Sequence, residues 1–241
     1  MRILITNDDG IYASQLIPLV KWAMKLGEVM VVAPKVEQSG KSHGIEIHKC
    51  FEVKTVELVE GVRAYAVDST PADCVRFAIL GLKEDFDLVI SGINRGLNVG
   101  ADIMYSGTVA AVFEAANLGV KAVAVSTEPK SYEGIVSYMD RVWEYVTERK
   151  LLEQHPLYNI NIPAQAGPIR ITRQGGPYYS DNFLPQENDL FLPQGIDVFA
   201  AADNYDRDTD TVLRGGMISV MPLTTDRTNL AVYESLRKWN D

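Results

Sequence analysis

The start of the chain alternates strand and helix patterns, and this alternation restricts the fold more than any other feature of the sequence. Residues 2–6 form a short apolar run typical of a buried strand, and residues 29–33 form another. Between them, residues 16–24 carry apolar side chains at helical spacing, with Ser14 as the expected N-cap and Gly27 as the expected C-cap. Two strands joined through a helix lie parallel with a right-handed crossover, so this segment predicts a parallel sheet.

The same alternation of strands and helices continues to about residue 165. It predicts an α/β core of residues 1–165, built on an open, doubly wound and mostly parallel sheet. Apolar, strand-like runs occur at residues 45–47, 53–56, 62–67, 88–90 and 122–125, and helical patterns begin at residues 71 and 108.

Residues 166–241 have a different pattern. Glycine and proline, as at residues 175–177, interrupt short β-like runs at residues 197–200 and 218–221, and residues 230–239 end the chain with a helical pattern. Such short β segments need partners to be stable. We therefore expect a β-rich C-terminal extension that cannot form a core of its own.

The charge balance of the chain restricts its ligands. The sequence has 32 Asp and Glu against 23 Lys and Arg, a net charge of −9, whereas binding of long nucleic acid depends on many basic side chains. A small phosphorylated ligand remains possible when a bound cation supplies positive charge. The apolar runs are too short for a signal peptide or a membrane span, so we expect a cytoplasmic protein that binds no membrane.

Asp8 and Asp9 directly follow the first predicted strand, in the sequence Asn7-Asp8-Asp9-Gly10. Asp-Gly is a strong turn signal, so the simplest interpretation is a tight turn before the helix. Ligands of open α/β sheets, however, bind outside the carboxyl ends of the strands. Two adjacent carboxylates at such an end repel each other unless a cation lies between them. The pair therefore predicts a site for a hard, oxygen-binding divalent ion.

Two more polar loops follow predicted strands. Gln38-Ser39-Gly40 follows the strand at residues 29–33, and Ser91-Gly92-Ile93-Asn94 follows the strand at residues 88–90. Parallel strands bring these loops to the edge that holds the Asp pair. Their hydroxyl and amide oxygens, with the two carboxylates, suit Mg²⁺ or Mn²⁺.

Ser106-Gly107-Thr108 precedes the helical pattern that begins at residue 108. Its simplest role is that of a Ser/Thr helix cap. A helix N-terminus also offers free backbone N–H groups and the positive end of a dipole, which suit a phosphate. Asn98, on the same loop, offers a further donor. The segment therefore predicts a phosphate site beside the metal site.

The segment Gly40-Lys41-Ser42-His43-Gly44 matches two competing motifs. It ends like the P-loop motif GxxxxGKS, but Lys35 stands where that motif has its first Gly. It also satisfies GxSxG, which leaves open a serine esterase with Ser42 as nucleophile and His155 as base. A nucleophile elbow needs a strand just before the turn and a helix just after it, and the sequence predicts neither here. A module that binds a nucleotide without hydrolysing it is a further alternative.

Several segments of the chain, in order, match one known family. They are residues 3–10, 32–34, 38–42, 70–75, 91–98, 105–109, 159–163 and 219–223. In these segments the chain resembles the SurE (survival protein E) family of nucleotidases, densely over residues 3–126 and in patches later. Ser69, Glu46 and Met221 depart from the residues usual in the family at those positions.

The resemblance implies a Rossmann-like core that binds one divalent metal ion, Mg²⁺ or Mn²⁺, per subunit. It also implies hydrolysis of nucleoside 5′- and 3′-monophosphates, in some members of short polyphosphate, and assembly as a homodimer or homotetramer through the C-terminal extension. The residues that it assigns are the metal ligands Asp8, Asp9, Ser39 and Asn94 and the phosphate-contacting residues Asn98, Ser106, Gly107 and Thr108.

Asp8 is the candidate catalytic residue. Three roles are open to it: a metal ligand only, a group that orients the attacking water, or a nucleophile that forms an aspartyl phosphate. The sequence around Asp8 lacks the DxDxT pattern of aspartyl-phosphate enzymes. This favours attack by water.

Overall fold

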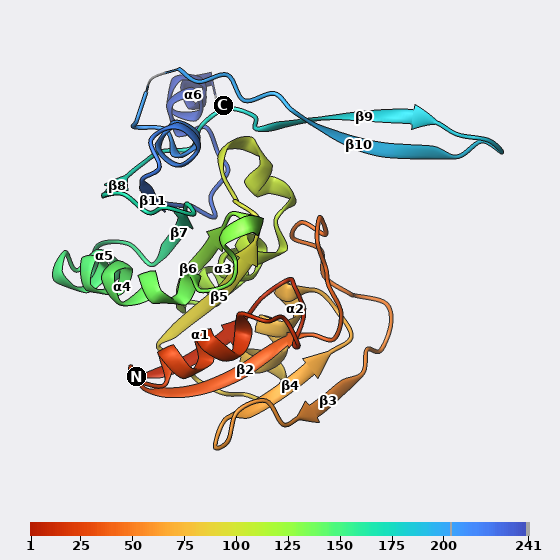
Figure 1. The fold of residues 1–241 in the computed structure, drawn as a ribbon, viewed down its shortest axis with the longest axis vertical. Helices are drawn as coiled ribbons and strands as arrows, with labels where there is room; N and C mark the ends of the chain where they lie inside the picture. Colours follow the sequence, from red (N-terminus) through yellow and green to blue (C-terminus); the bar gives the residue numbers. More distant parts are fainter. Residues whose placement is uncertain (203, 240–241) are drawn as a thin grey trace.

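The structure is a computed structural model that describes residues 1–202 and 204–239, so residues 203, 240 and 241 of the predicted extension lie outside it. Most strands of the described part form one sheet (Figure 1), in which β3–β4 and β7–β11 are antiparallel pairs and the other pairs are parallel. A Rossmann-like, doubly wound and mostly parallel sheet is thereby confirmed. In sheet order, the strands are β3 (Val53–Val56), β4 (Arg63–Val67), β2 (Glu28–Pro34), β1 (Arg2–Thr6), β5 (Leu88–Arg95), β6 (Lys121–Thr127), β7 (Leu157–Ile162), β11 (Ile218–Pro222) and β8 (Ile169–Ile171).

Helices cover both faces of the sheet (Figure 1). On one face lie α1 (Leu16–Ala23), α4 (Met139–Glu148) and α5 (Leu151–Gln154), and on the other lie α2 (Pro71–Arg76) and α3 (Gly107–Asn117). Each layer of helices buries one face of the central strands, so these strands are apolar on both sides, as is usual for parallel sheets.

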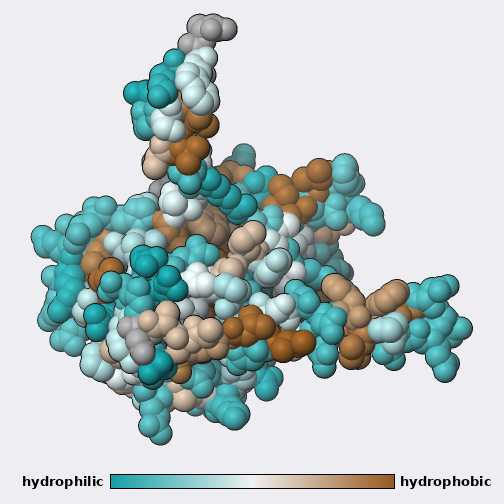
Figure 2. Space-filling model, turned by 90° about the horizontal axis from the view of Figure 1, so that it is seen from above, coloured by the Kyte–Doolittle hydropathy of each residue, from teal (hydrophilic) through white to brown (hydrophobic). Residues whose placement is uncertain are grey.

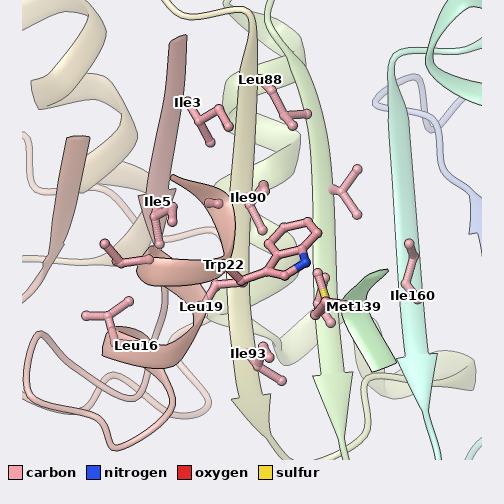
Figure 3. Close-up of a cluster of buried hydrophobic side chains, with 14 of the residues drawn as sticks. Ile3, Ile5, Leu16, Leu19, Trp22, Leu88, Ile90, Ile93, Met139 and Ile160 are labelled. Atoms are coloured by element: carbon pink, nitrogen blue, oxygen red, sulfur yellow. The ribbon is translucent and has the colours of Figure 1, made fainter. Parts of the chain in front are cut away.

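The core under α1 shows how the helix is held on the sheet. Leu19 and Trp22 point from α1 onto Ile5, Ile90 and neighbouring side chains of the strands (Figure 3), and all of them are buried. Burial of one such side chain contributes about 1.5–3 kcal/mol. The helical spacing of apolar residues in the sequence therefore indicated the correct contact face.

The predicted caps of α1 are wrong. The helix begins after Gln15 without a side-chain cap, because the Ser14 hydroxyl donates to Glu133 Oε1 at 2.7 Å instead. It ends at Met24, and Gly27 lies in the turn that follows. A Cβ at residue 27 would lie 1.9 Å from the carbonyl oxygen of Met1, so the glycine is needed for a close approach of two backbone segments.

The helices α2 and α3 begin as predicted. Pro71 is the first residue of α2, and the Thr70 hydroxyl accepts a hydrogen bond from the Asp73 backbone. In α3 the Ser106 hydroxyl accepts from the backbone N–H of Val109 at 3.1 Å. Both helices therefore start at the sheet edge where β1, β2 and β5 end.

Three strand predictions need correction. The run predicted at residues 88–90 continues as β5 to Arg95, past a register shift against β6. The strand expected at residues 197–200 is instead β10 (Phe191–Asp197). Ile45 and Ile47 lie in a loop and are 40% and 70% exposed. The alternation of these two side chains therefore does not mark a strand that packs against the core.

Two elements of the C-terminal extension project from the body (Figures 1 and 2). The hairpin of β9 (Tyr179–Pro185) and β10 carries exposed apolar side chains such as Phe183 and Leu192. The helix α6 (Leu230–Leu236) has no buried residue. In residues 1–202 and 204–239, no helix combines the length and the apolar character needed to span a membrane.

Candidate active site

The candidate site lies where the strands β1, β2 and β5 end. The strand β1 pairs with β2 on one side and β5 on the other, and the chain order of the sheet reverses there. Ligands of open α/β sheets bind in the crevice at such a switch point. Asp8, Asp9 and Ser39 lie in the loops that follow β1 and β2, whereas Asn94, predicted in a loop, lies near the end of β5 itself.

Asp8 is buried at the end of β1, with 4% of its surface exposed. Its Oδ1 accepts a hydrogen bond from the hydroxyl of Thr108, the second residue of α3. Burial raises the pKa of Asp8 above its ordinary value, and hydrogen bonds from Thr108 oppose this rise. The carboxylate is thus fixed in orientation while its charge is poorly solvated.

Asp9 is held by the backbone of β5. Its Oδ2 accepts a hydrogen bond from the backbone N–H of Arg95 at 3.0 Å, and the hydroxyl of Tyr132 lies 3.5 Å from the same oxygen. Burial and the neighbouring charge of Asp8 raise the pKa of Asp9 to about 6. In the described part of the chain, no salt bridge joins either aspartate to a basic side chain. The pair therefore lacks a protein counter-charge.

Ser39 and Asn94 are placed near the Asp pair by hydrogen bonds of the residues next to them in the chain. The backbone N–H of Gln38 donates to the carbonyl of Asp8 at 2.7 Å, which fixes the loop of Ser39 beside β1. Asn94 precedes Arg95, whose N–H bonds Asp9. The Asn94 amide donates to the carbonyl of Gly96 at 2.7 Å, so its carbonyl oxygen points away from that contact.

Glu37 belongs to this edge and was not predicted. Its Oε1 accepts a hydrogen bond from the Ser39 hydroxyl at 2.6 Å. Its charge helps to raise the pKa of both Asp8 and Asp9. The only signal for it was its place in the sequence, as an acidic residue in the loop after β2, two positions before Ser39.

The start of α3 is in contact with Asp8. A Cβ at Gly107 would lie 2.9 Å from Cβ and 3.2 Å from Oδ2 of Asp8, so only glycine leaves the carboxylate its place. Ser106 caps the helix, and Thr108 uses its hydroxyl on Asp8. These three residues were predicted to contact phosphate through the helix N-terminus. Two of their side chains are engaged in holding the site, which leaves the backbone end of α3 as the feature suited to an anion.

Asn98 lies in a buried network beside the site. Its side-chain amide donates to Ser126 Oγ, and its backbone carbonyl accepts from the side-chain amides of Asn159 and Asn161, all at 2.8 Å. Asn98 is 8% exposed. The structure therefore places this predicted phosphate contact within a cluster of amides that joins β6 and β7.

The donors at this edge suit a hard divalent cation. Carboxylate, hydroxyl and amide oxygens are the ligands such ions take, and two neighbouring carboxylates without a basic partner favour a bound positive charge. Among the described residues no three His, Cys, Asp or Glu side chains are grouped as a metal site. Ser39 and Asn94 add a hydroxyl and an amide oxygen to the donors near Asp8 and Asp9.

The segment Gly40-Lys41-Ser42-His43-Gly44 does not form a nucleophile elbow. No helix follows it, and the Ser42 hydroxyl donates to the carbonyl of Met104 at 2.6 Å. His155 is bonded to the carbonyl of Leu223. The geometry that a serine esterase requires is therefore not present in this segment.

Comparison with known proteins agrees with this architecture. Residues 3–181 match the family model described as Survival protein SurE. The 5′-nucleotidase SurE of Syntrophotalea carbinolica is 38% identical, over 100% of this chain and 98% of its own length. The 5′-nucleotidase SurE of Caldanaerobacter subterraneus subsp. tengcongensis is 36% identical, over 98% of this chain and 96% of its own. The crystal structure of the SurE protein from Aquifex aeolicus has a TM-score of 0.79 at 29% identity and covers 100% of both chains. The chain therefore belongs to the SurE family.

Proposed function

We propose that this protein is a 5′-nucleotidase that hydrolyses nucleoside monophosphates to nucleoside and phosphate with the help of a divalent metal ion. The observation that carries the proposal is the contact between Asp8 and the N-terminus of α3, with Asp9 alongside. It brings a candidate cation site and a candidate phosphate site next to each other. Relatives that are 36–38% identical over nearly the whole chain bear the name 5′-nucleotidase SurE.

In this proposal one Mg²⁺ or Mn²⁺ per subunit is held by Asp8, Asp9, Ser39 and Asn94. Their oxygens come from the loops after β1 and β2 and from the end of β5. A bound divalent cation supplies positive charge that stabilises the transferring phosphoryl group and favours deprotonation of water.

The substrate phosphate is expected at the N-terminus of α3. The backbone N–H groups of Gly107 and Thr108 and the helix dipole would hold its oxygens as negative charge develops during the reaction, whereas the N–H of Ser106 already donates to the carbonyl of Ile103 at 3.3 Å. Asn98 supports the same loop, and its role as a direct phosphate contact stays a prediction. Nucleoside 3′-monophosphates and short polyphosphate offer the same terminal phosphoryl group and are included as candidate substrates.

Asp8 is expected to orient the water that attacks phosphorus. The hydrogen bond from Thr108 occupies Oδ1 and fixes the carboxylate plane. Attack by Asp8 itself is the alternative. A single turnover in heavy-oxygen water detects it when water cleaves the aspartyl phosphate at carbon, and acid trapping of phosphorylated protein detects it when water cleaves at phosphorus. Attack by water puts the label into phosphate alone, whereas hydrolysis of an aspartyl phosphate at carbon would put it into Asp8.

A phosphate-release assay tests the function as a whole. The panel contains nucleoside 5′- and 3′-monophosphates, short polyphosphate and a carboxylic ester, each with Mg²⁺, with Mn²⁺ and with excess chelator. We expect release from monophosphates only with metal, and a severe loss of kcat in Asp9→Asn. Full activity in chelator, or hydrolysis of the carboxylic ester alone, would contradict the proposal.

We further propose that residues 1–165 form the catalytic core of a cytoplasmic protein and that residues 166–241 serve assembly into a homodimer or homotetramer. Every candidate site residue lies in the first part. The exposed apolar side chains of the β9–β10 hairpin and of α6 support a role in subunit contacts. Light scattering that finds only a monomer at micromolar concentration would contradict this assembly.

A further inference from the structure

A cavity of about 420 Å³ lies beside α3, with Ser106, Ala110 and Phe113 in its lining. Its walls are largely apolar, with Ile103, Met104, Phe113 and Leu223 among the lining residues. Gln174, Asp226 and Arg227 add polar groups. A volume of this size with apolar walls and a few polar groups is typical of a small-molecule site.

The cavity adjoins the candidate phosphate site through Ser106. This residue lines the cavity and also caps α3, whose next two residues touch Asp8. A phosphate bound at this helix end would therefore lie next to the cavity. The organic group attached to that phosphate would have the cavity within reach.

One wall of the cavity is a fixed, flat imidazole. His43 Nε2 lies 2.9 Å from Glu114 Oε2, and Arg76 donates to the other Glu114 oxygen at 3.0 Å. The His43 ring lies nearly parallel to that of Phe113, at 17° and 6.4 Å between centroids. A rigid aromatic surface of this kind suits stacking of a planar ring.

The segment that carries His43 is anchored to the same side of the cavity. The backbone N–H of Ser42 donates to the carbonyl of Tyr105 at 3.0 Å, and its hydroxyl donates to the carbonyl of Met104. The Gly40–Gly44 segment, which resembles an esterase motif in sequence, therefore contributes His43 to the cavity wall. Its position follows from contacts with α3 and with the turn before it.

We propose that this cavity binds the nucleoside part of the substrate, with the base against His43 and Phe113. The inference rests on the proposed function, because it places the phosphate at the start of α3. Apolar side chains cover the faces of the base, and the polar groups of Gln174 and Asp226 are available to its edges. His43 is a specificity-determining residue in this arrangement, oriented by Glu114.

The test compares a nucleoside 5′-monophosphate with ribose 5-phosphate, which has the same reacting group but no base. Met104→Ala removes an apolar side chain from the cavity lining, and Thr224→Trp adds a large side chain to it. We expect the ratio of kcat/KM for the nucleotide to that for ribose 5-phosphate to fall about tenfold in each variant. Met24→Ala, an exposed methionine on α1 outside the cavity lining, is the matched control and should keep the wild-type ratio.

Three outcomes would overturn the inference. If kcat/KM falls equally for the nucleotide and for ribose 5-phosphate, the variants act on the phosphate site and not on a base site. Unchanged kinetics with an altered mass in light scattering would assign the cavity to contact with a second copy of the chain. A wild-type protein that hydrolyses neither substrate would contradict the proposed function, and calorimetry with the nucleotide and with the nucleoside alone would then decide the cavity's role. If Thr224→Trp does not weaken nucleoside binding, the cavity is not the nucleoside site.

Discussion

The hydroxyl of Thr108 donates a hydrogen bond to Oδ1 of Asp8, so the second residue of α3 is bonded to the end of β1. The two residues are 100 positions apart in the chain. Both side chains are buried, and this contact links the candidate metal ligand to the helix end expected to hold the phosphate. Displacement of either side chain should therefore affect both parts of the site.

Thr108→Val tests this link. Valine keeps the shape of threonine but leaves a buried carboxylate oxygen without its donor, at a cost of about 1–3 kcal/mol in stability. We expect kcat for nucleotide hydrolysis to fall about 10–100-fold, as for other residues that orient a metal ligand. Thr211→Val is the matched control, because Thr211 is also buried and donates to the carbonyl of Tyr205 at 2.7 Å. If both variants reduce kcat equally, Thr108 has only a structural role.

Gly107→Ala tests the close contact between α3 and Asp8. The added Cβ would lie 2.9 Å from Cβ of Asp8, so the aspartate or the helix must shift. A misplacement of about 1 Å near the reacting groups can cost about 100-fold in rate, and we expect a loss of this size. Gly176→Ala is the control, because a Cβ added at that residue would meet no other segment of the described chain within 4 Å. Calorimetric titration with Mn²⁺ should show weaker binding in Gly107→Ala alone.

The sequence was sufficient to predict the sheet and the Asp pair because both depend on local patterns. Apolar runs of strand length mark β1 and β2, and Asp8 and Asp9 follow β1 directly. Position at a strand end is enough to assign such a pair to the ligand-binding edge of a parallel sheet. The N-cap role of Ser106 could also be predicted, because capping depends on the local sequence at the start of a helix.

The sequence did not indicate contacts between distant segments. The hydroxyl of Thr108 could serve a phosphate or a neighbouring side chain, and only the packing of α3 against β1 directs it to Asp8. The alternation of Ile45 and Ile47 predicted a strand, but the loop is held by contacts such as that of the Glu46 N–H with Asp73 Oδ2 at 2.8 Å. Tertiary hydrogen bonds thus determined the backbone where the local pattern was ambiguous.

Two serines in one loop separate the metallophosphatase from the serine esterase. Ser39→Ala removes a proposed metal ligand, so the Mn²⁺ concentration for half-maximal activity should rise about tenfold, the equivalent of roughly 1.4 kcal/mol. Ser42→Ala removes a hydrogen bond to Met104 and should lower stability more than metal affinity. Titration of activity with Mn²⁺ in both variants distinguishes the two classes of enzyme. Loss of all turnover in Ser42→Ala with a normal response in Ser39→Ala would reverse the assignment.

An acid-sensitive ion cluster joins β1, β4 and the loop before β5. Glu84 accepts from Arg2 at 2.5 Å and from Arg63 at 2.6 Å, and these guanidinium groups lower its pKa to about 2. A carboxyl group whose pKa is lowered in the folded state stabilises the fold above its unfolded pKa, near 4.5. That contribution is lost as the pH falls from 4.5 towards 2.

Glu84→Gln should therefore lower the urea midpoint of unfolding at pH 7, and the difference from the wild type should shrink below pH 4.5. Glu60→Gln is the matched control, since Glu60 is exposed and has no ion pair among the described residues. Because the cluster is partly exposed to solvent, 1 M NaCl should also reduce the difference at pH 7. A difference that stays constant from pH 7 to pH 2.5 would mean that glutamine disturbs packing and that the charge of Glu84 does not stabilise the fold.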